Sequence, residues 1–181
     1  MSQSAVMSPV RLLMELESRS RANAAELPQK REMMEMWNGI AFRIGETSLI
    51  APMDEVVEIL HIPAMSRVPN TKSWVLGIAN VRGNLLPVMD LPGFLFGRNS
   101  AAQKRSRILV VSKLAVFSGL VVDEVYGMRH FERKGFTTDL PKSEPAFAPY
   151  VERCYTDKDR QWLVFSTHKL ADNPDFLHVG L

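Results

Sequence analysis

The side chains that could take part in catalysis are few, and their spacing does not bring them together. None of the four histidines stands at metal-ligand spacing from a second histidine, a cysteine or a carboxylate motif; they are His61, His130, His168 and His178. Asp123 and Glu124 are adjacent carboxylates, but neighbours in a strand point to opposite faces, so the pair cannot readily share a proton. Cys154, the one cysteine, lies in an apolar strand segment and is expected to be a buried packing residue.

Motifs that hold a nucleotide, a metal ion or an activated serine are also absent from the sequence. It contains no glycine-rich loop of the GxGxxG or GxxxxGKS/T type, no HExxH and no GxSxG. We therefore predict that the chain is not an enzyme and that it holds neither a cofactor nor a metal ion.

One cationic side chain is a better candidate for a function, and that function would be binding. Arg82 stands between two apolar segments, immediately before Gly83, which places it at the tip of a predicted hairpin. A long cation in that position cannot serve the core, and arginine makes directional contacts with carboxylates and backbone carbonyls. Arg82 is therefore either a recognition residue or a solvated turn arginine.

A second cationic group lies in a polar, turn-rich loop. It consists of Lys104, Arg105 and Arg107, with Arg98 nearby. The group is either a solvated loop or a patch for phosphate or an acidic partner. Because a small β-barrel with a basic loop can bind RNA, RNA binding stays open on these residues.

The elements that must position these residues belong to a chain of ordinary globular composition. It has 181 residues, 46% hydrophobic, with 22 Lys and Arg against 20 Asp and Glu, so the net charge is +2. That balance argues against a strongly cationic nucleic-acid binder and excludes an acidic disordered chain. The single cysteine fits a reducing cytoplasm, no apolar run approaches the roughly 20 residues of a membrane helix, and the charged start does not read as a signal peptide. We expect a cytoplasmic protein with one main domain.

The chain changes character near Trp37. Residues 1–36 predict a helical extension, because Ser8 and Pro9 suit a helix start and an apolar stripe at helical spacing follows them. Three roles stay open for this extension: packing on the main domain, docking of a partner, or disorder. Residues 173–181 are expected to be a C-terminal tail.

From residue 37 onward the apolar pattern has period two and predicts short strands. Strands are expected at 40–44, 47–51, 76–81, 85–91, 108–111, 116–122, 125–131, 150–155 and 162–165. With turns every 8 to 12 residues and about ten strands, the pattern indicates an all-β sandwich or barrel. Pro87 inside a strand argues for an edge or bulged position.

Helices are expected at three places in this part of the chain. Pro52 begins a predicted helix that puts Met53, Val56, Val57 and Leu60 on one face. A helical turn is expected near 94–96, within a loop at 92–106, and Thr167 caps a short helix over 168–171.

One block of the sequence resembles a known family. Residues 77–91 read GIANVRGNLLPVMDL and follow APMDEVVEIL and RVP. The block resembles the CheW family of chemotaxis coupling proteins, whose pattern is G-V/I-x-N-x-R-G, then apolar residues and P-V-x-D-L. Two weaker matches, RILVVSKLAVFSGLVVDEVYGM and YVERCYTDKDRQWLVFSTHKL, extend the likeness over residues 38–172.

The resemblance implies two five-stranded SH3-like β-barrels around a shared hydrophobic core, within residues 37–172, and no catalytic activity. Members of the family bridge the cytoplasmic tip of a methyl-accepting chemoreceptor and the regulatory domain of a CheA-type histidine kinase. The resemblance therefore implies these two protein partners, no nucleic acid, no membrane insertion and recruitment to receptor arrays. The partner-binding positions that it implies are Met53, Val56, Glu58, Gly77, Asn80, Arg82 and Gly83.

The pathway stays open at this level. The helical extension, WNGIAFRIGE and GFLFG resemble the branch of the family that serves type IV pilus (twitching) systems. A flagellar chemotaxis adaptor is the alternative within the family. A small β-barrel that binds RNA through Lys104, Arg105 and Arg107 is the alternative from a different class.

Overall fold

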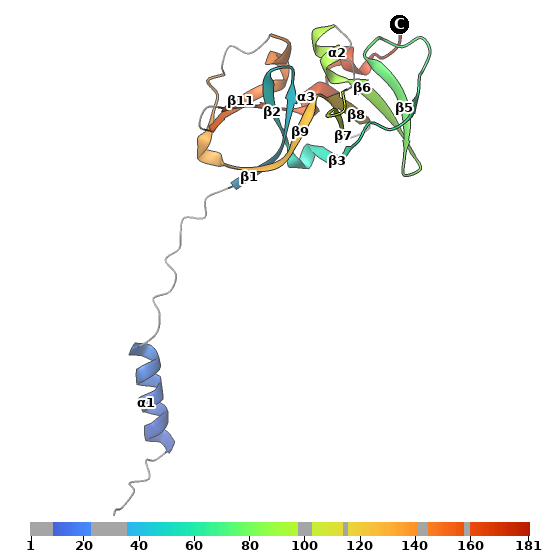
Figure 1. Ribbon diagram of the computed structural model, residues 1–181. Coiled ribbons are helices and arrows are strands. Elements are labelled where there is room, and N and C mark those ends of the chain that lie inside the picture. Colours follow the sequence, from blue (N-terminus) through green and yellow to red (C-terminus); the bar gives the residue numbers. More distant parts are fainter. Residues whose placement is uncertain (1–8, 23–35, 98–102, 114–115, 141–144, 158–159) are drawn as a thin grey trace, which may run out of the picture. The chain divides into compact units, whose positions relative to one another are not determined.

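A computed structural model describes residues 9–22, 36–97, 103–113, 116–140, 145–157 and 160–181 of the chain (Figure 1). The chain divides into two compact units, Met1–Met34 and Glu35–Leu181. The first unit contains the predicted helix, α1 (Pro9–Ala22). Its large apolar side chains are exposed: Val10, Leu12, Leu13, Met14 and Leu16. Among the residues described, no helix combines the length and apolar character needed to cross a membrane.

The second unit is built from two six-stranded sheets, which we call lobe A and lobe B. In lobe A the strand order is β10-β11-β12-β2-β1-β9 and in lobe B it is β3-β7-β8-β6-β5-β4. Each sheet has five longer strands and one strand of two residues, which agrees with the expected pair of five-stranded barrels. Figure 1 shows lobe A on the left and lobe B on the right, each curling around its own interior.

Lobe A takes its strands from both ends of the unit, whereas lobe B is continuous in sequence. The strands of lobe A are β1 (Met36–Ile44), β2 (Thr47–Pro52), β9 (Glu124–Glu132), β10 (Phe136–Thr137), β11 (Val151–Asp157) and β12 (Arg160–Phe165). Those of lobe B are β3 (Val56–Leu60), β4 (Met65–Ser66), β5 (Val75–Val81), β6 (Asn84–Asp90), β7 (Arg107–Lys113) and β8 (Val116–Val122). Neighbouring strands are antiparallel except β12 with β2 and β6 with β8, which are parallel.

The period-two pattern explains how one strand can serve two cores. In β1, Ile40, Phe42 and Ile44 face the core shared by the two lobes, while Ala41 faces the interior of lobe A. The interior of lobe B is aliphatic, with Leu86, Val88, Ile108, Val110 and Val121 among its buried side chains. The interior of lobe A is mainly aromatic: Trp37, Tyr126, Phe131, Phe136, Tyr155 and Trp162.

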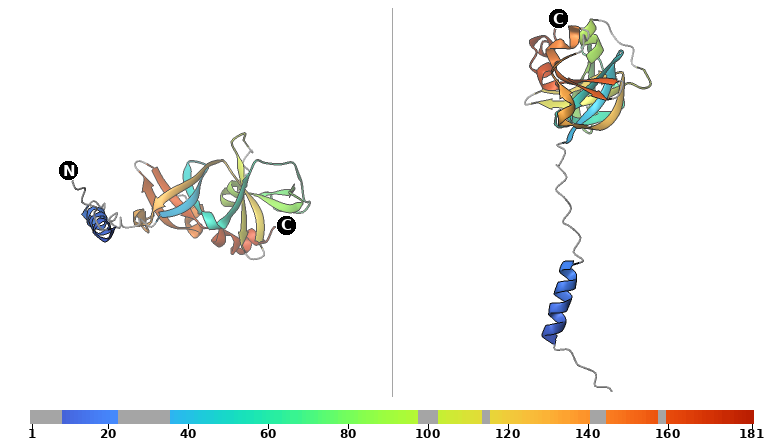
Figure 2. Two further views of the ribbon diagram at one scale, coloured as in Figure 1. Left: turned by 90° about the horizontal axis from the view of Figure 1, so that it is seen from below. Right: turned by 90° about the vertical axis from the view of Figure 1, so that its left-hand side faces the viewer.

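Four short helices contribute side chains to the shared core: α2 (Leu91–Phe96), η3 (Pro145–Tyr150), α3 (Thr167–Ala171) and α4 (Pro174–Leu177). The single turn η1 (Met53–Glu55) joins β2 of lobe A to β3 of lobe B, and η2 (Arg133–Gly135) lies within lobe A between β9 and β10. The residues expected to form a C-terminal tail are ordered instead. Phe176 of α4 is 2% exposed in the shared core, and Gly180 forms a β-bridge with Thr71. Figure 2 shows this end of the chain against lobe B.

The prediction of a helix beginning at Pro52 was wrong. Only the single turn η1 is helical, and Val56–Leu60 forms strand β3, which pairs with β7. Two valines and an isoleucine favour a strand, and the exposure of this segment alternates as a strand requires.

Two smaller expectations also change. Pro87 lies in β6, an interior strand, but pairing with β8 begins only at Val88, so no backbone N–H is needed from Pro87 on that side. Ser166, not Thr167, is the N-cap of α3, and its hydroxyl accepts from the backbone N–H of Lys169.

Candidate functional site

The turn between β5 and β6 holds Arg82 in a conformation that arginine rarely adopts. Arg82 has φ 52° and Gly83 has φ 85°, so both residues of this two-residue loop are left-handed, as a tight hairpin turn requires. The side-chain oxygen of Asn80 accepts from the backbone N–H of Gly83 at 2.9 Å and stabilises the turn. A left-handed residue other than glycine costs roughly 1–2 kcal/mol, and asparagine would fit here better than arginine. An arginine that is kept at this cost points to a function.

Arg82 reaches across lobe B to the far edge of its sheet. Its Nη2 lies 2.5 Å from Oε1 of Glu58 in β3, the strand at the opposite end of the sheet order from β4 and β5. The Arg82 side chain is 77% exposed and that of Glu58 27%. An exposed pair of this kind contributes only about 0–1 kcal/mol to stability. The pair therefore orients two charged groups at the surface more than it holds the lobe together.

Exposed apolar side chains lie on the same segments as this pair. Met53 of η1 is 46% exposed, Val57 of β3 62% and Leu85 of β6 69%. Val57 and Ile59 point away from Glu58, because side chains alternate along β3. We use the name Glu58–Arg82 surface for the ion pair together with the exposed apolar residues on or next to the segments that carry it, which include the outer face of β3: Met53, Val57, Ile59 and Leu85. The sequence analysis placed Val57 on a helix face and named neither Ile59 nor Leu85 as a site residue. Recognising a strand at 56–60 would have indicated, from its alternation, that Val57 and Ile59 are exposed on one face.

Two of the sequence-predicted site residues are not free surface positions. Val56 is half-buried and packs against the shared core. Gly77 is buried at φ 147°, and a Cβ there would lie 2.3 Å from the carbonyl oxygen of Ser66. Gly77 thus allows β4 to approach β5. The structure brings Glu58, Asn80, Arg82 and Gly83 together, whereas Val56 packs toward the shared core and Gly77 against β4.

A buried carboxylate that the sequence did not reveal connects the two lobes. Glu55 of η1 is 7% exposed. Its Oε2 accepts from the backbone N–H of Thr167 at 2.6 Å, from the Thr167 hydroxyl at 2.7 Å and from the backbone N–H of His168 at 3.2 Å. These donors lie at the start of α3, directly after β12 of lobe A, while Glu55 directly precedes β3 of lobe B. Glu55 therefore positions the strand that carries Glu58.

The candidate catalytic groups have structural roles. Asp123 accepts from the backbone N–H of Gly45 at 2.7 Å, and Glu124 lies 3.5 Å from Arg43. Burial raises the pKa of the Cys154 thiol, which opposes formation of a nucleophilic thiolate. Among the described residues, no three histidine, cysteine or acidic side chains gather where a metal ion could bind.

The basic group considered for RNA binding is partly occupied by the protein itself. Arg107 donates to the backbone carbonyls of Lys104 and Ser106, and Arg105 lies 3.7 Å from Glu124. Arg98 falls outside the described residues. The geometry thus offers little support for RNA binding at this loop.

Comparison with known proteins finds similarity to CheW-like proteins over most of the chain. The family model of the CheW-like domain matches residues 38–175. PilI from Pseudomonas aeruginosa is 46% identical over 176 residues, which cover 97% of this chain and 98% of that protein. FrzA from Myxococcus xanthus is 32% identical over 60% of this chain and 64% of its own length. Among solved structures, the scaffolding protein TtCheW from Thermoanaerobacter tengcongensis matches with a TM-score of 0.62 and 25% identity, over 71% of this chain and 88% of that chain.

Proposed function

The chain belongs to the CheW-like domain family and is therefore a non-catalytic adaptor, and we propose that it couples a methyl-accepting chemoreceptor to a CheA-type histidine kinase in a type IV pilus chemosensory system. We further propose that it acts in the cytoplasm, at the receptor arrays. The observation that carries the proposal is the strained, exposed Arg82, held by Glu58 at the edge of lobe B.

The Glu58–Arg82 surface has the composition of a protein-binding site. Arginine is enriched among the residues that dominate binding energies, and the exposed apolar side chains of the neighbouring segments offer area that a partner can cover. Only Nη2 of Arg82 contacts Glu58, so the other N–H groups of the guanidinium can donate to a carboxylate or carbonyl of the partner. Asn80 and Gly83 hold the turn in place, so the arginine is positioned before the partner arrives.

An adaptor of this kind works by coupling free energies. A receptor signal shifts a conformational equilibrium, and the adaptor must hold the kinase so that its activity follows that shift. A coupling free energy of about 1–3 kcal/mol changes an equilibrium roughly 5- to 150-fold. Short helices and Glu55 connect the lobes, so a conformational change caused by a partner bound to lobe B can be passed to the shared core.

The proposal is tested by binding of the purified full chain to the regulatory domain of a CheA-type kinase and to a receptor's cytoplasmic tip. Arg82→Ala should weaken one of the two by about tenfold or more while the chain stays folded. Arg153→Ala, an exposed arginine in lobe A, is the matched control and should bind both partners normally. Unchanged affinity of Arg82→Ala for both partners would contradict the proposal.

A second variant tests the apolar part of the surface. Val56→Glu is a poor probe, because Val56 packs against the shared core and the charge would destabilise the fold. Val57→Glu places the same charge at a 62% exposed position of the same strand. We expect Val57→Glu to reduce partner binding without reducing the free energy of unfolding.

The pathway is tested by measuring binding of the chain to the CheA-type kinase of the pilus system and to that of the flagellar system. The match to PilI includes most of the helical extension, since it covers 97% of this chain, whereas CheW from Thermotoga maritima matches over 49%. This supports the pilus system. Preferential binding to the kinase of the pilus gene set is expected, and preference for the flagellar kinase would favour the alternative.

The extension is tested by deletion of residues 1–34, one of the two compact units. With five large apolar side chains exposed, α1 has the surface of a docking helix. We propose that its removal lowers affinity for a partner of the pilus system while the remaining domain unfolds at the same temperature. Loss of neither affinity nor stability would make the extension a plain tail.

A further inference from the structure

The segment that leads into β3 is exposed on both sides of a residue that is fixed to the other lobe. Met53 of η1 is 46% exposed and Val57 of β3 is 62% exposed, and both belong to the proposed binding surface. Glu55 lies between them in the sequence and is 7% exposed. A partner that covers Met53 and Val57 therefore contacts a segment whose central carboxylate is buried between the lobes.

The attachment of Glu55 to the start of α3 depends mainly on one oxygen. Its Oε2 accepts from three donors of Thr167 and His168, the closest at 2.6 Å. Its Oε1 makes longer contacts, 3.4 Å to the Ser166 hydroxyl and 3.7 Å to Nδ1 of His168. Hydrogen bonds depend on distance and direction, whereas packed apolar surfaces can slide past each other. Glu55 is therefore a defined point of attachment within an otherwise apolar contact between the lobes.

The helix that receives this carboxylate is linked to two strands of lobe A. Ser166 alone separates α3 from the end of β12. Nζ of Lys169 in α3 lies 2.8 Å from Oε1 of Glu152 in β11. Leu170, which is 1% exposed, belongs to the shared core. A displacement of Glu55 would thus be passed to a helix that is joined to β11 and β12.

A bulge in β3 lies between Glu55 and Glu58. The facing strand β7 pairs with Val56 and, at its next position, with Glu58, so Val57 is left over. A bulge leaves its extra residue outside the ladder and bends the strand. Contact of a partner with Val57 therefore acts on backbone that the sheet does not hold, two residues from the anchored Glu55.

We propose that Glu55 is a positioning residue for signal transfer: through α3 it passes to lobe A the effect of a partner bound at the Glu58–Arg82 surface. The inference rests on the proposed function, because it requires a partner at that surface. Glu55 itself offers a partner almost no surface. Binding and kinase control therefore depend on different residues, with Arg82 serving binding and Glu55 serving the transfer.

The first test uses the isotope-labelled full chain and the partner whose affinity Arg82→Ala lowers. Shifts of the Val57 and Arg82 amide resonances report binding, and shifts of the Thr167 and His168 amides report transfer to α3. We expect both pairs to shift in the parent chain, which needs no variant.

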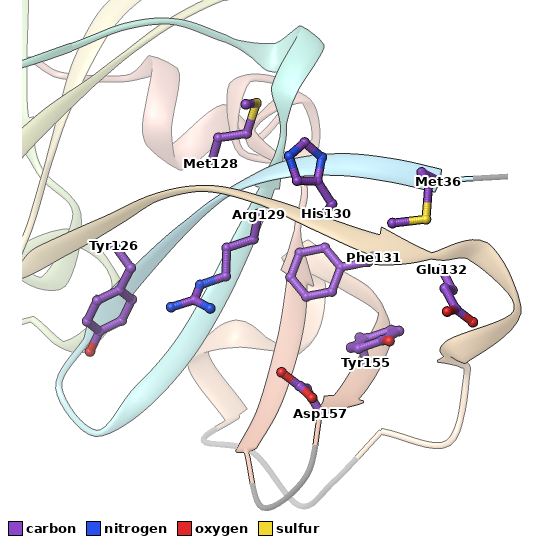
Figure 3. Close-up of a pocket in the computed structure, with 9 residues that line it drawn as sticks. All are labelled: Met36, Tyr126, Met128, Arg129, His130, Phe131, Glu132, Tyr155 and Asp157. Carbon is purple, nitrogen blue, oxygen red and sulfur yellow. The ribbon is translucent and has the colours of Figure 1, made fainter. Parts of the chain in front are cut away.

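The control for this test is an amide of lobe A away from α3. β9 packs against the shared core at Val125, and Glu132 lies at the other end of this strand, beside the pocket that Figure 3 shows. The Glu132 amide should not shift. A shift there as large as that of Thr167 would mean that the partner alters lobe A as a whole and not through Glu55.

The second test measures kinase control, the ratio of kinase activities with and without a receptor stimulus, in a complex reconstituted with the full chain. Glu55→Gln keeps an acceptor oxygen but loses the charge, which weakens the hydrogen bonds to about half their strength. We expect both partners to bind within about twofold of the parent and kinase control to fall by about 2- to 30-fold, as for residues that transmit coupling. Asp54→Asn removes the exposed neighbouring charge and should change neither quantity.

Three results would overturn the inference. One is a shift of the Val57 and Arg82 amides with none at Thr167 and His168, which would confine the effect of the partner to lobe B. Another is full kinase control by Glu55→Gln, shown to be folded by a thermal melt. The third is a parallel loss of affinity and control in this variant, which would make Glu55 part of the binding surface. Absence of any shift at Val57 and Arg82 would instead contradict the proposed function, and the inference with it.

Discussion

The two lobes have the same number of strands but bring the edges of their sheets together differently. In lobe B an ion pair joins Glu58 of the edge strand β3 to Arg82 of the β5–β6 turn, and the interior of the lobe is aliphatic. In lobe A aromatic rings meet across the edges, with Phe131 against Tyr155 and Phe136. Buried rings supply much more stability than an exposed ion pair. Lobe B therefore leaves its charged contact exposed at the surface, where we propose that a partner binds, whereas the aromatic contact of lobe A serves folding.

The largest effect is expected where the aromatic contact is removed. Phe131→Ala deletes a 3% exposed ring and should lower the free energy of unfolding by about 4 kcal/mol. Glu58→Gln breaks the contact in lobe B and should cost less than about 1 kcal/mol. Urea unfolding of both variants measures the difference, and equal costs would contradict the contrast between the lobes.

The second-largest change in the free energy of unfolding is expected where Glu55 connects the two lobes. Glu55→Ala leaves the backbone N–H groups of Thr167 and His168 without their acceptor and should cost about 3 kcal/mol. Asp54→Ala, at the exposed neighbour, is the control and should be close to neutral. A Glu55→Ala variant as stable as the control would show that this carboxylate does not join the lobes.

Substitution of two glycines, one in each lobe, distinguishes the cost of a left-handed backbone from the cost of a steric clash. Both have positive φ, but a Cβ at Gly77 would lie 2.3 Å from the Ser66 oxygen, while at Gly45 it would meet nothing within 4 Å. Gly45→Ala should cost about 1 kcal/mol, from the left-handed conformation alone. Gly77→Ala should cost about 2 kcal/mol more, because β4 must move. If thermal unfolding shows that both variants lose a similar amount of stability, β4 can move away from a new Cβ at little cost in free energy.

The regions that the sequence predicted well are those with local signals. The β5–β6 hairpin follows from alternating apolar residues on either side of Arg82-Gly83, which correctly places Arg82 in the turn, while its role in binding stays a prediction. The segment 56–60 was misassigned because its apolar positions fit a helix as well as a strand, and the pairing with β7 decides between them. That pairing joins residues about fifty positions apart and leaves no local mark.

Contacts between distant segments explain what sequence analysis missed. Glu55 meets Thr167, 112 residues away, so its burial could not be read from its neighbours. Arg129 and Arg160 are ordinary charged strand residues in the sequence, and only the curl of lobe A brings both to Trp162. The chemistry of such sites depends on the closure of a sheet, which no short pattern encodes.

The central claim is that Arg82 is kept for partner binding and not for stability, and Arg82→Asn tests it most directly. Asparagine suits the left-handed conformation at φ 52°, so the variant should be as stable as the parent or more stable, by up to about 1 kcal/mol. Titration of the full chain, parent and variant, with the kinase regulatory domain and with the receptor tip measures binding. We predict at least one affinity lower by about tenfold, or about 1.4 kcal/mol, with no loss of stability. Unchanged affinity for both partners would contradict the claim and leave Arg82 a solvated turn residue.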